Sequence, residues 1–270
     1  MKKPTLKSGA SVKPSAESAK SRRRVAHESR FYGIPLPGVP VEELTGKLIV
    51  IEGCDGSGRS TQIALLTEWL ESAGFAVQTM GLRRSNLMAR NIEDILERNS
   101  VTRLTLSLIY ATDLFDQIEH QMIPALRSGF VVLADRYIYS LMARAAVRGV
   151  ARGYLDGIYQ PAVRPDLTFY LNVSPDNAFQ REIEKSDVIS YWEAGRDMSL
   201  SNDLYESFVI YQTRVRAEFD RMAQRHGFID VDGNARIQDV NRKLRQSIAR
   251  KLGIHNTRYR PSPALHHLWR

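Results

Sequence analysis

The sequence predicts an α/β fold: a doubly wound, five-stranded parallel sheet with helices on both faces. Short apolar runs alternate with longer stretches whose apolar residues recur at helical spacing. The first apolar run, residues 48–51, ends in a glycine-rich turn, which is typical of a buried parallel strand that leads into a helix. In such sheets ligands bind beyond the carboxyl ends of the strands, so functional residues are expected there.

Apolar runs bounded by glycine, proline or polar residues give the expected strands. These are residues 48–51, 75–77, 130–134, 167–173 and 228–231. Apolar residues at intervals of three and four predict the helices. These are residues 60–73, 87–98, 104–126, 204–226 and 237–252, with further helical stretches up to about residue 160 and from Pro175. Pro124 is expected to bend the third of these helices near its end.

Positive charge is concentrated at the N-terminus. The formal net charge is +8, and residues 1–30 hold nine Lys and Arg against two Glu, a balance of +7. This segment has no apolar periodicity, which predicts a disordered basic tail. The tail could touch nucleic acid, but a solvated extension is the favoured interpretation, so the domain itself is not expected to bind nucleic acid.

The other boundaries follow from composition. Residues 31–46 carry three prolines and are expected to form an extended linker against the domain surface. Residues 47–252 hold all the expected strands and helices and form the domain. Residues 253–270 are expected to be a loosely attached C-terminal tail.

The composition also bears on disulfide bonding, membrane contact and the cellular location of the protein. Cys54 is the single cysteine, which excludes an intramolecular disulfide and a zinc site built from several cysteines. No apolar run approaches the roughly 20 residues that span a bilayer, so no membrane contact is expected. The N-terminus lacks the apolar core of a secretory signal. The expected location is cytoplasmic.

The turn after the first strand has the pattern of a phosphate-binding loop. It matches G-x-x-x-x-G-K-[ST], except that Arg59 stands where the pattern has lysine. Glycines let backbone N–H groups curl around phosphate oxygens, and the helix that follows points its positive end at the anion. The residues expected to bind the triphosphate are Gly53, Cys54, Asp55, Gly56, Ser57, Gly58, Arg59, Ser60 and Thr61.

Arg59 is the main irregularity of this loop. Arginine is longer than lysine and forked, so the two side chains are not interchangeable. Arg59 could bridge two phosphates through a bidentate contact, or it could prevent productive geometry. The Ser60 hydroxyl is expected to ligate magnesium.

Residues 47 to about 252 resemble thymidylate kinases. The resemblance is carried by residues 52–62 (EGCDGSGRSTQ), by the triplet Asp135-Arg136-Tyr137 after the third strand, and by residues 165–173 (PDLTFYLNV). It implies a P-loop kinase-like fold. It also implies transfer of a phosphoryl group from ATP, with Mg2+, to a nucleoside monophosphate, with thymidine monophosphate as first choice and its diphosphate as product.

The resemblance gives roles to residues outside the loop. Asp135 would lie near the metal or the acceptor phosphate, and Arg136 would grip that phosphate. Asp55 would face the acceptor nucleotide, and Tyr110 would stack on its base. From the residues alone, the triplet could equally be a helix cap, a salt bridge and a core tyrosine, and Tyr110 could belong to the core.

The sequence departs from the family where the base is read. Leu114 stands where the family usually has an arginine, and Ser140 is followed by Leu141. Arg144 or Arg148 could supply a replacement, although no pattern establishes it. The expected substrate-binding residues are Asp55, Tyr110, Arg136, Ser140 and Arg144. The choice of thymidine monophosphate therefore rests on the resemblance alone.

A lid is expected at about residues 185–203, where related kinases close over the donor. Arg196 is the expected lid residue that neutralises the transferring group, together with Arg59, Asp135 and Arg136. Two alternatives stay open: a catalytically weak or inactive nucleotide-binding regulatory module of the same fold, and a kinase for a different acceptor. A homodimer is expected by analogy only.

Overall fold

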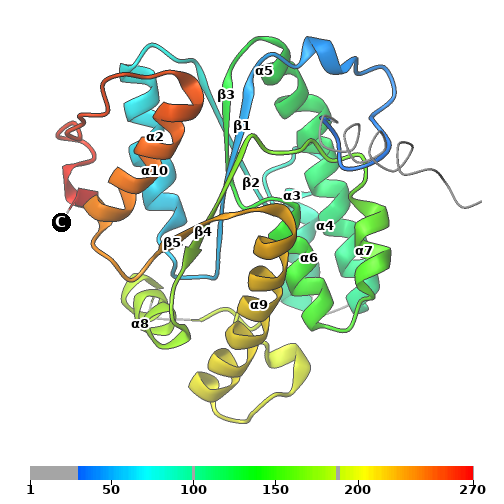
Figure 1. Ribbon diagram of the computed structural model, residues 1–270. Helices are drawn as coiled ribbons and strands as arrows, with labels where there is room; N and C mark the ends of the chain where they lie inside the picture. Colours follow the sequence, from blue (N-terminus) through cyan, green and yellow to red (C-terminus); the bar gives the residue numbers. More distant parts are fainter. Residues whose placement is uncertain (1–29, 99–100, 187–188, 270) are drawn as a thin grey trace, which may run out of the picture.

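The computed structural model describes residues 30–98, 101–186 and 189–269. Its sheet has five parallel strands, as the sequence predicts, and their order is β2-β3-β1-β4-β5 (Figure 1). The strands are β1 (Lys47–Gly53), β2 (Val77–Gly81), β3 (Val131–Asp135), β4 (Leu167–Asn172) and β5 (Ile229–Asp232). The main helices are α2 (Arg59–Ser72), α3 (Ala89–Arg98), α4 (Arg103–Gln117), α5 (Ile123–Arg127), α6 (Ile138–Val147), α7 (Arg152–Ile158), α8 (Pro175–Ser186), α9 (Leu204–His226) and α10 (Ile237–Leu252).

Helices cover both faces of the sheet (Figure 1). In β1 the side chains alternate, so that Leu48 and Val50 pack with α4, α5, α6 and α9, whereas Ile49 and Ile51 pack with α2 and α10. All four are fully buried. Burial on both faces explains why β1 is apolar throughout instead of alternating with polar residues.

The predicted helix at 104–126 is interrupted just before Pro124, where the sequence predicts a bend. A π-helical turn, Ile118–Met122, separates α4 from α5, and the Ile123 N–H donates to the Ile118 carbonyl five residues back. Proline has no N–H and its ring collides with the carbonyl four residues earlier, so the wider turn accommodates it.

The segment before β1 packs closely on the domain. Phe31 is fully buried and pairs with Val163 in an isolated antiparallel bridge. The Tyr32 N–H donates to the Ala162 carbonyl over 3.1 Å. These contacts join the expected linker to the core. The predicted basic tail, apart from Arg30, lies outside the described residues.

The tail after α10 returns along α2. The Tyr259 hydroxyl and the Ser262 backbone N–H both donate to the Glu68 carboxylate, over 2.8 and 2.9 Å. Arg245 lies over the rings of Trp69 and Tyr259. Side-chain pairings of this kind leave no periodic signal, so the sequence suggests a looser attachment than the structure has.

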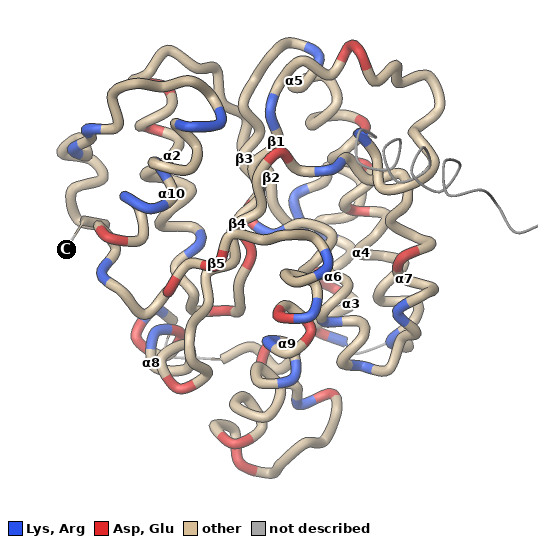
Figure 2. The backbone as a smooth tube through the Cα atoms, viewed as in Figure 1, with Lys and Arg blue, Asp and Glu red and all other residues tan. Residues whose placement is uncertain are grey.

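Charged residues of both signs are interspersed on the helices of both faces (Figure 2). Among the described residues, no helix has both the length and the apolar content that crossing a membrane requires.

Candidate active site

The loop between β1 and α2 has the geometry of a phosphate cradle. Gly56 has φ of +73°, and a Cβ there would lie 2.4 Å from the Ala178 carbonyl oxygen, so only glycine fits. The α2 helix begins at Arg59, directly after the loop. Beside the loop lies a cavity of about 340 Å³. Its lining comprises Gly56, Ser57, Gly58, Arg59, Ser60, Thr61, Gln62, Arg181, Glu182, Lys185, Gly233, Ala235, Ile237 and Val240.

Arg59 lies folded into this loop. Its Nη1 donates to the Gly53 carbonyl and to Ser57 Oγ, both over 2.8 Å, and also to the Cys54 carbonyl. Its Nε donates to Asp135 Oδ1 over 2.9 Å. The guanidinium is nearly buried. The fork of arginine therefore fits the loop by satisfying main-chain oxygens.

Asp135, at the carboxyl end of β3, also binds the loop serine. Ser60 Oγ donates to Asp135 Oδ2 over 2.8 Å. Burial opposes ionisation of Asp135, but the positive charges of Arg59 and Arg136 outweigh it and hold its pKa below the usual range. A hydroxyl and an ionised carboxylate are ligands that Mg2+ accepts when nucleotide phosphates and water complete its shell.

Arg136 turns to the opposite side of the loop. Its φ is +72°, a conformation rare for non-glycine residues, and its N–H donates to the Ile51 carbonyl over 3.0 Å. Its Nη1 donates to the Gly53 carbonyl over 2.9 Å and to Ser140 Oγ over 3.0 Å, and its Nη2 donates to Asp55. Burial, together with the nearby Arg59 charge, lowers the pKa of Arg136 to about 10, so it is still protonated at neutral pH.

Asp55 accepts hydrogen bonds from two arginines. Arg144 Nη2 donates to both of its oxygens, over 3.0 and 2.8 Å, and Arg136 binds Oδ1. Burial disfavours the charged carboxylate, but the arginines outweigh burial and hold its pKa well below the usual range. Two cations on one side of the loop form an anion site whose present counter-ion is Asp55.

A narrow cavity lies between α4 and α6, next to this cluster. Its wall includes Tyr110, Arg144 and Trp192. Leu114 is fully buried in the core and does not line the cavity. Asp113 beside it accepts from the Arg83 and Ser85 N–H groups.

A family model described as thymidylate kinase matches residues 51–244, which include the loop and both arginine sites. The chain belongs to the thymidylate kinase family. It is 37% identical over 204 residues to a probable thymidylate kinase 2 of Saccharolobus solfataricus, covering 75% of this chain and 95% of the relative. It is 29% identical over 212 residues to a thymidylate kinase of Caldicellulosiruptor saccharolyticus, covering 76% and 97%. The chain is thus an ATP-dependent phosphotransferase of the nucleoside monophosphate kinase class.

In this thymidylate kinase family member, the predicted lid arginine lies away from the loop. Arg196 Nη1 donates to the carbonyls of Ser201 and Asn202, over 3.4 and 2.8 Å, and it does not line the loop cavity. Two other cations do. Arg181 donates to the Gly233 carbonyl over 2.9 Å, and Lys185 follows it by four residues on α8. Arg181 and Lys185 are four residues apart, which puts both side chains on one face of the helix. This spacing is the feature of the sequence that could have indicated a shared role at the loop cavity.

Glu52 is the other residue that sequence reasoning missed. It is fully buried and accepts from the Tyr137 N–H over 2.9 Å, and from Ser140 N–H and Oγ over 3.2 and 2.5 Å. Burial raises the pKa of Glu52. Tyr137 itself is a core residue whose hydroxyl donates to Val163. Glu52 thus fixes the turn that separates Asp135 from the start of α6, and its signal was an acidic residue directly after the apolar run of residues 48–51.

Proposed function

We propose that this enzyme transfers the terminal phosphoryl group of Mg2+·ATP to thymidine monophosphate. The observation that carries the proposal is that two consecutive residues, Asp135 and Arg136, contact different sets of partners. Asp135 turns to Arg59 and Ser60, and Arg136 turns to Asp55 and Ser140. A metal–triphosphate site and an acceptor-phosphate site would therefore adjoin at the end of β3, as in-line transfer requires.

On the donor side, the main-chain amides of residues 53–60 would hold the triphosphate. Ser60 and Asp135 would hold the magnesium ion, which neutralises phosphate charge when bound. Arg181 and Lys185, which line the same cavity, would add positive charge around the terminal phosphate.

On the acceptor side, Arg136 and Arg144 would exchange part of their contact with Asp55 for the acceptor phosphate. The Asp55 carboxylate would then be free to accept a hydrogen bond from a sugar hydroxyl. Tyr110 would border the base, since it lines the cavity next to Arg144.

The reaction needs positioning and charge neutralisation more than covalent help. An oxygen of the acceptor phosphate forms a bond to the terminal phosphorus of ATP, and the bond to the bridging oxygen breaks to release ADP. Arg59 would have to turn from the Gly53 and Ser57 oxygens to follow the group. For Arg196 to take part, it must first leave the Ser201 and Asn202 carbonyls.

The choice of thymidine monophosphate is supported by the family and by the names of the relatives. Formation of a homodimer stays a prediction, as does the expectation that the domain itself does not bind nucleic acid.

The test is a coupled assay of ADP release with purified full-length protein, ATP, Mg2+ and a panel of nucleoside monophosphates. We expect the highest kcat/KM with thymidine monophosphate. A higher kcat/KM with another nucleoside monophosphate would overturn thymidine monophosphate as the acceptor but would leave the proposed phosphoryl transfer in place. ATP binding without turnover of any acceptor would instead support the regulatory-module alternative.

A further inference from the structure

One face of α6 leads outward from the acceptor-phosphate cluster. Ser140 contacts Glu52 and Arg136, Arg144 contacts Asp55, and Arg148 caps the helix. These residues are four apart, so each lies about 6 Å beyond the last. Arg144 and Arg148 both line the narrow cavity next to Tyr110. A monophosphate held at Arg136 and Arg144 would thus direct its base along this row toward Arg148.

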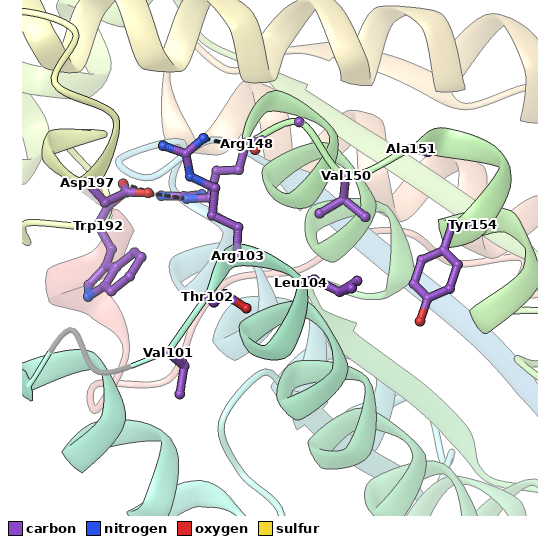
Figure 3. Close-up of a pocket in the computed structure, with 11 residues that line it drawn as sticks. Val101, Thr102, Arg103, Leu104, Arg148, Val150, Ala151, Tyr154, Trp192 and Asp197 are labelled. Carbon is purple, nitrogen blue, oxygen red and sulfur yellow. Dashed lines mark hydrogen bonds and ion pairs between the residues drawn. The ribbon is translucent and has the colours of Figure 1, made fainter.

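A larger outer pocket of about 780 Å³ adjoins the narrow cavity. The two share three wall residues: Arg103, Arg148 and Trp192. Figure 3 shows that the outer wall comes from the start of α4, the α6–α7 connection and the lid. The narrow cavity has a volume of only about 40 Å³, so a base next to Tyr110 and Arg144 would extend toward this outer pocket.

The far wall of the outer pocket is mostly apolar. Leu104 and Tyr154 line it with 46% of each residue exposed, and Val150 and Ala151 lie between them in sequence. In Figure 3 the Leu104, Val150 and Tyr154 side chains lie on the same side of Arg148. Exposed apolar side chains that border a binding cavity favour an apolar occupant.

The Arg148 guanidinium has no N–H left to donate a hydrogen bond to a base. Its Nε and Nη2 bind both Asp197 oxygens over 2.9 and 3.0 Å, and Nη2 also donates to the Trp192 carbonyl. Its Nη1 donates to the Tyr211 hydroxyl and to the Arg144 carbonyl, over 2.6 and 3.3 Å. All the donors of the guanidinium are thus engaged, and the group lies between the Trp192 and Tyr211 rings.

We propose that the acceptor site takes pyrimidine monophosphates whose base carries, at its C5 position, an apolar substituent larger than methyl. This inference rests on the proposed function, since it places the phosphate at Arg136 and Arg144. The substituent lies in the outer pocket against Leu104, Val150 and Tyr154. Arg148, Asp197 and Trp192 form a fixed shoulder between the base and the substituent.

A purine fits this arrangement less well. Its distal edge carries polar ring and exocyclic atoms that lose water in the pocket and need partners. The Arg148 donors are already engaged, and Arg103, which lines both cavities, donates from Nη1 to the Arg148 carbonyl over 3.4 Å. Leu104, Val150 and Tyr154 present an apolar face. An apolar C5 substituent has no such need.

The test compares kcat/KM for thymidine monophosphate, for 5-propynyl- and 5-phenyl-deoxyuridine monophosphate, and for purine deoxynucleoside monophosphates. The expected result is that at least one extended pyrimidine matches or exceeds thymidine monophosphate, since each buried methylene can contribute up to about fourfold. Affinity of the same compounds is measured by calorimetry, so that binding is seen even where turnover is slow.

Two variants test the place of the substituent. Leu104→Trp fills the outer pocket and should lower the ratio of extended analogue to thymidine monophosphate at least tenfold. Leu108→Trp, one turn along α4 and similarly exposed at 41%, lies outside the pocket and should leave the ratio within twofold.

The outcomes separate this inference from the function on which it rests. Turnover of thymidine monophosphate with rejection of both extended analogues would overturn the inference and keep the function. Equal effects of the two tryptophan variants, or preference for a purine, would also overturn it. Turnover of an extended analogue but not of thymidine monophosphate would keep the inference and overturn the proposed acceptor.

Discussion

Arg59 and Asp135 form a buried ion pair, with Arg59 Nε 2.9 Å from Asp135 Oδ1, and the other Asp135 oxygen accepts from Ser60. The cation of the phosphate loop and the two proposed metal ligands are therefore one hydrogen-bonded unit. A lysine ammonium could make the same ion pair, but it could not donate from one planar group to the Gly53 and Ser57 oxygens as well.

Replacement of Arg59 by alanine should weaken ATP binding at least tenfold, about 1.4 kcal/mol. The change removes the positive charge inside the loop, and it removes one of the two guanidinium donors to the Gly53 carbonyl and the side-chain donor to Ser57 Oγ. Calorimetry with ATP and Mg2+ measures the loss. Arg214→Ala, at an exposed position of α9, is the control and should bind as the wild type does. Unchanged affinity of Arg59→Ala would remove this arginine from the mechanism.

Asp135→Asn should raise the Mg2+ concentration for half-maximal binding of a fluorescent ATP analogue at least tenfold. The amide keeps the size of the carboxylate but loses the charge that attracts a divalent cation. Ser60→Ala should act in the same direction, because its hydroxyl contacts the other Asp135 oxygen. Asp156→Asn, at an ion pair on the surface, is the control. An unshifted titration for both site variants would place the metal elsewhere.

Arg144→Ala should raise KM for the nucleoside monophosphate about 10- to 100-fold and leave the dissociation constant of ATP within threefold. Arg144 contacts Asp55 on the acceptor side and does not line the loop cavity. Steady-state kinetics with each substrate varied in turn separates the two effects. The control is Arg152→Ala, whose side chain is 57% exposed and pairs with Glu218. Equal losses for both substrates would contradict an acceptor-specific role.

The fold was predictable because its signals are local. The β1 run and the glycine-rich turn determine one strand–loop–helix unit, and repetition of that unit gives the parallel sheet. The π-helical turn was foreshadowed by Pro124, because a proline acts on its own helix. The site was predictable where its residues lie next to such signals, as Arg59 and Asp135 do.

The sequence could not predict how side chains meet across the fold. Leu114 stands where the family usually has an arginine, and α4 places this leucine in the core. Arg196 was the expected lid cation, yet nearby carbonyls hold it and Arg181 lines the loop cavity. Those outcomes depend on the rotation of α4 and on the path of residues 189–203, which are determined by contacts distant in sequence.

His226 should make stability depend on pH below neutrality. Its ring packs among Tyr32, Tyr139 and Phe228, and burial, with the nearby Arg225 charge, lowers its pKa to about 4 from an ordinary value near 6.5. In the unfolded chain His226 is therefore protonated below about pH 6.5, whereas in the folded protein it stays neutral until the pH falls to about 4. The stabilisation is complete above pH 6.5 and is lost as pH falls through that window.

Replacement of His226 by phenylalanine keeps an aromatic ring in the cluster and removes the titrating group. The melting temperature of the variant, measured from pH 4 to pH 8, should fall less steeply below pH 6.5 than that of the wild type. His120→Phe is the matched control, because the side chain of His120 is 71% exposed and lies outside this cluster. Parallel curves for the wild type and the His226 variant would show that proton uptake at His226 does not determine acid sensitivity.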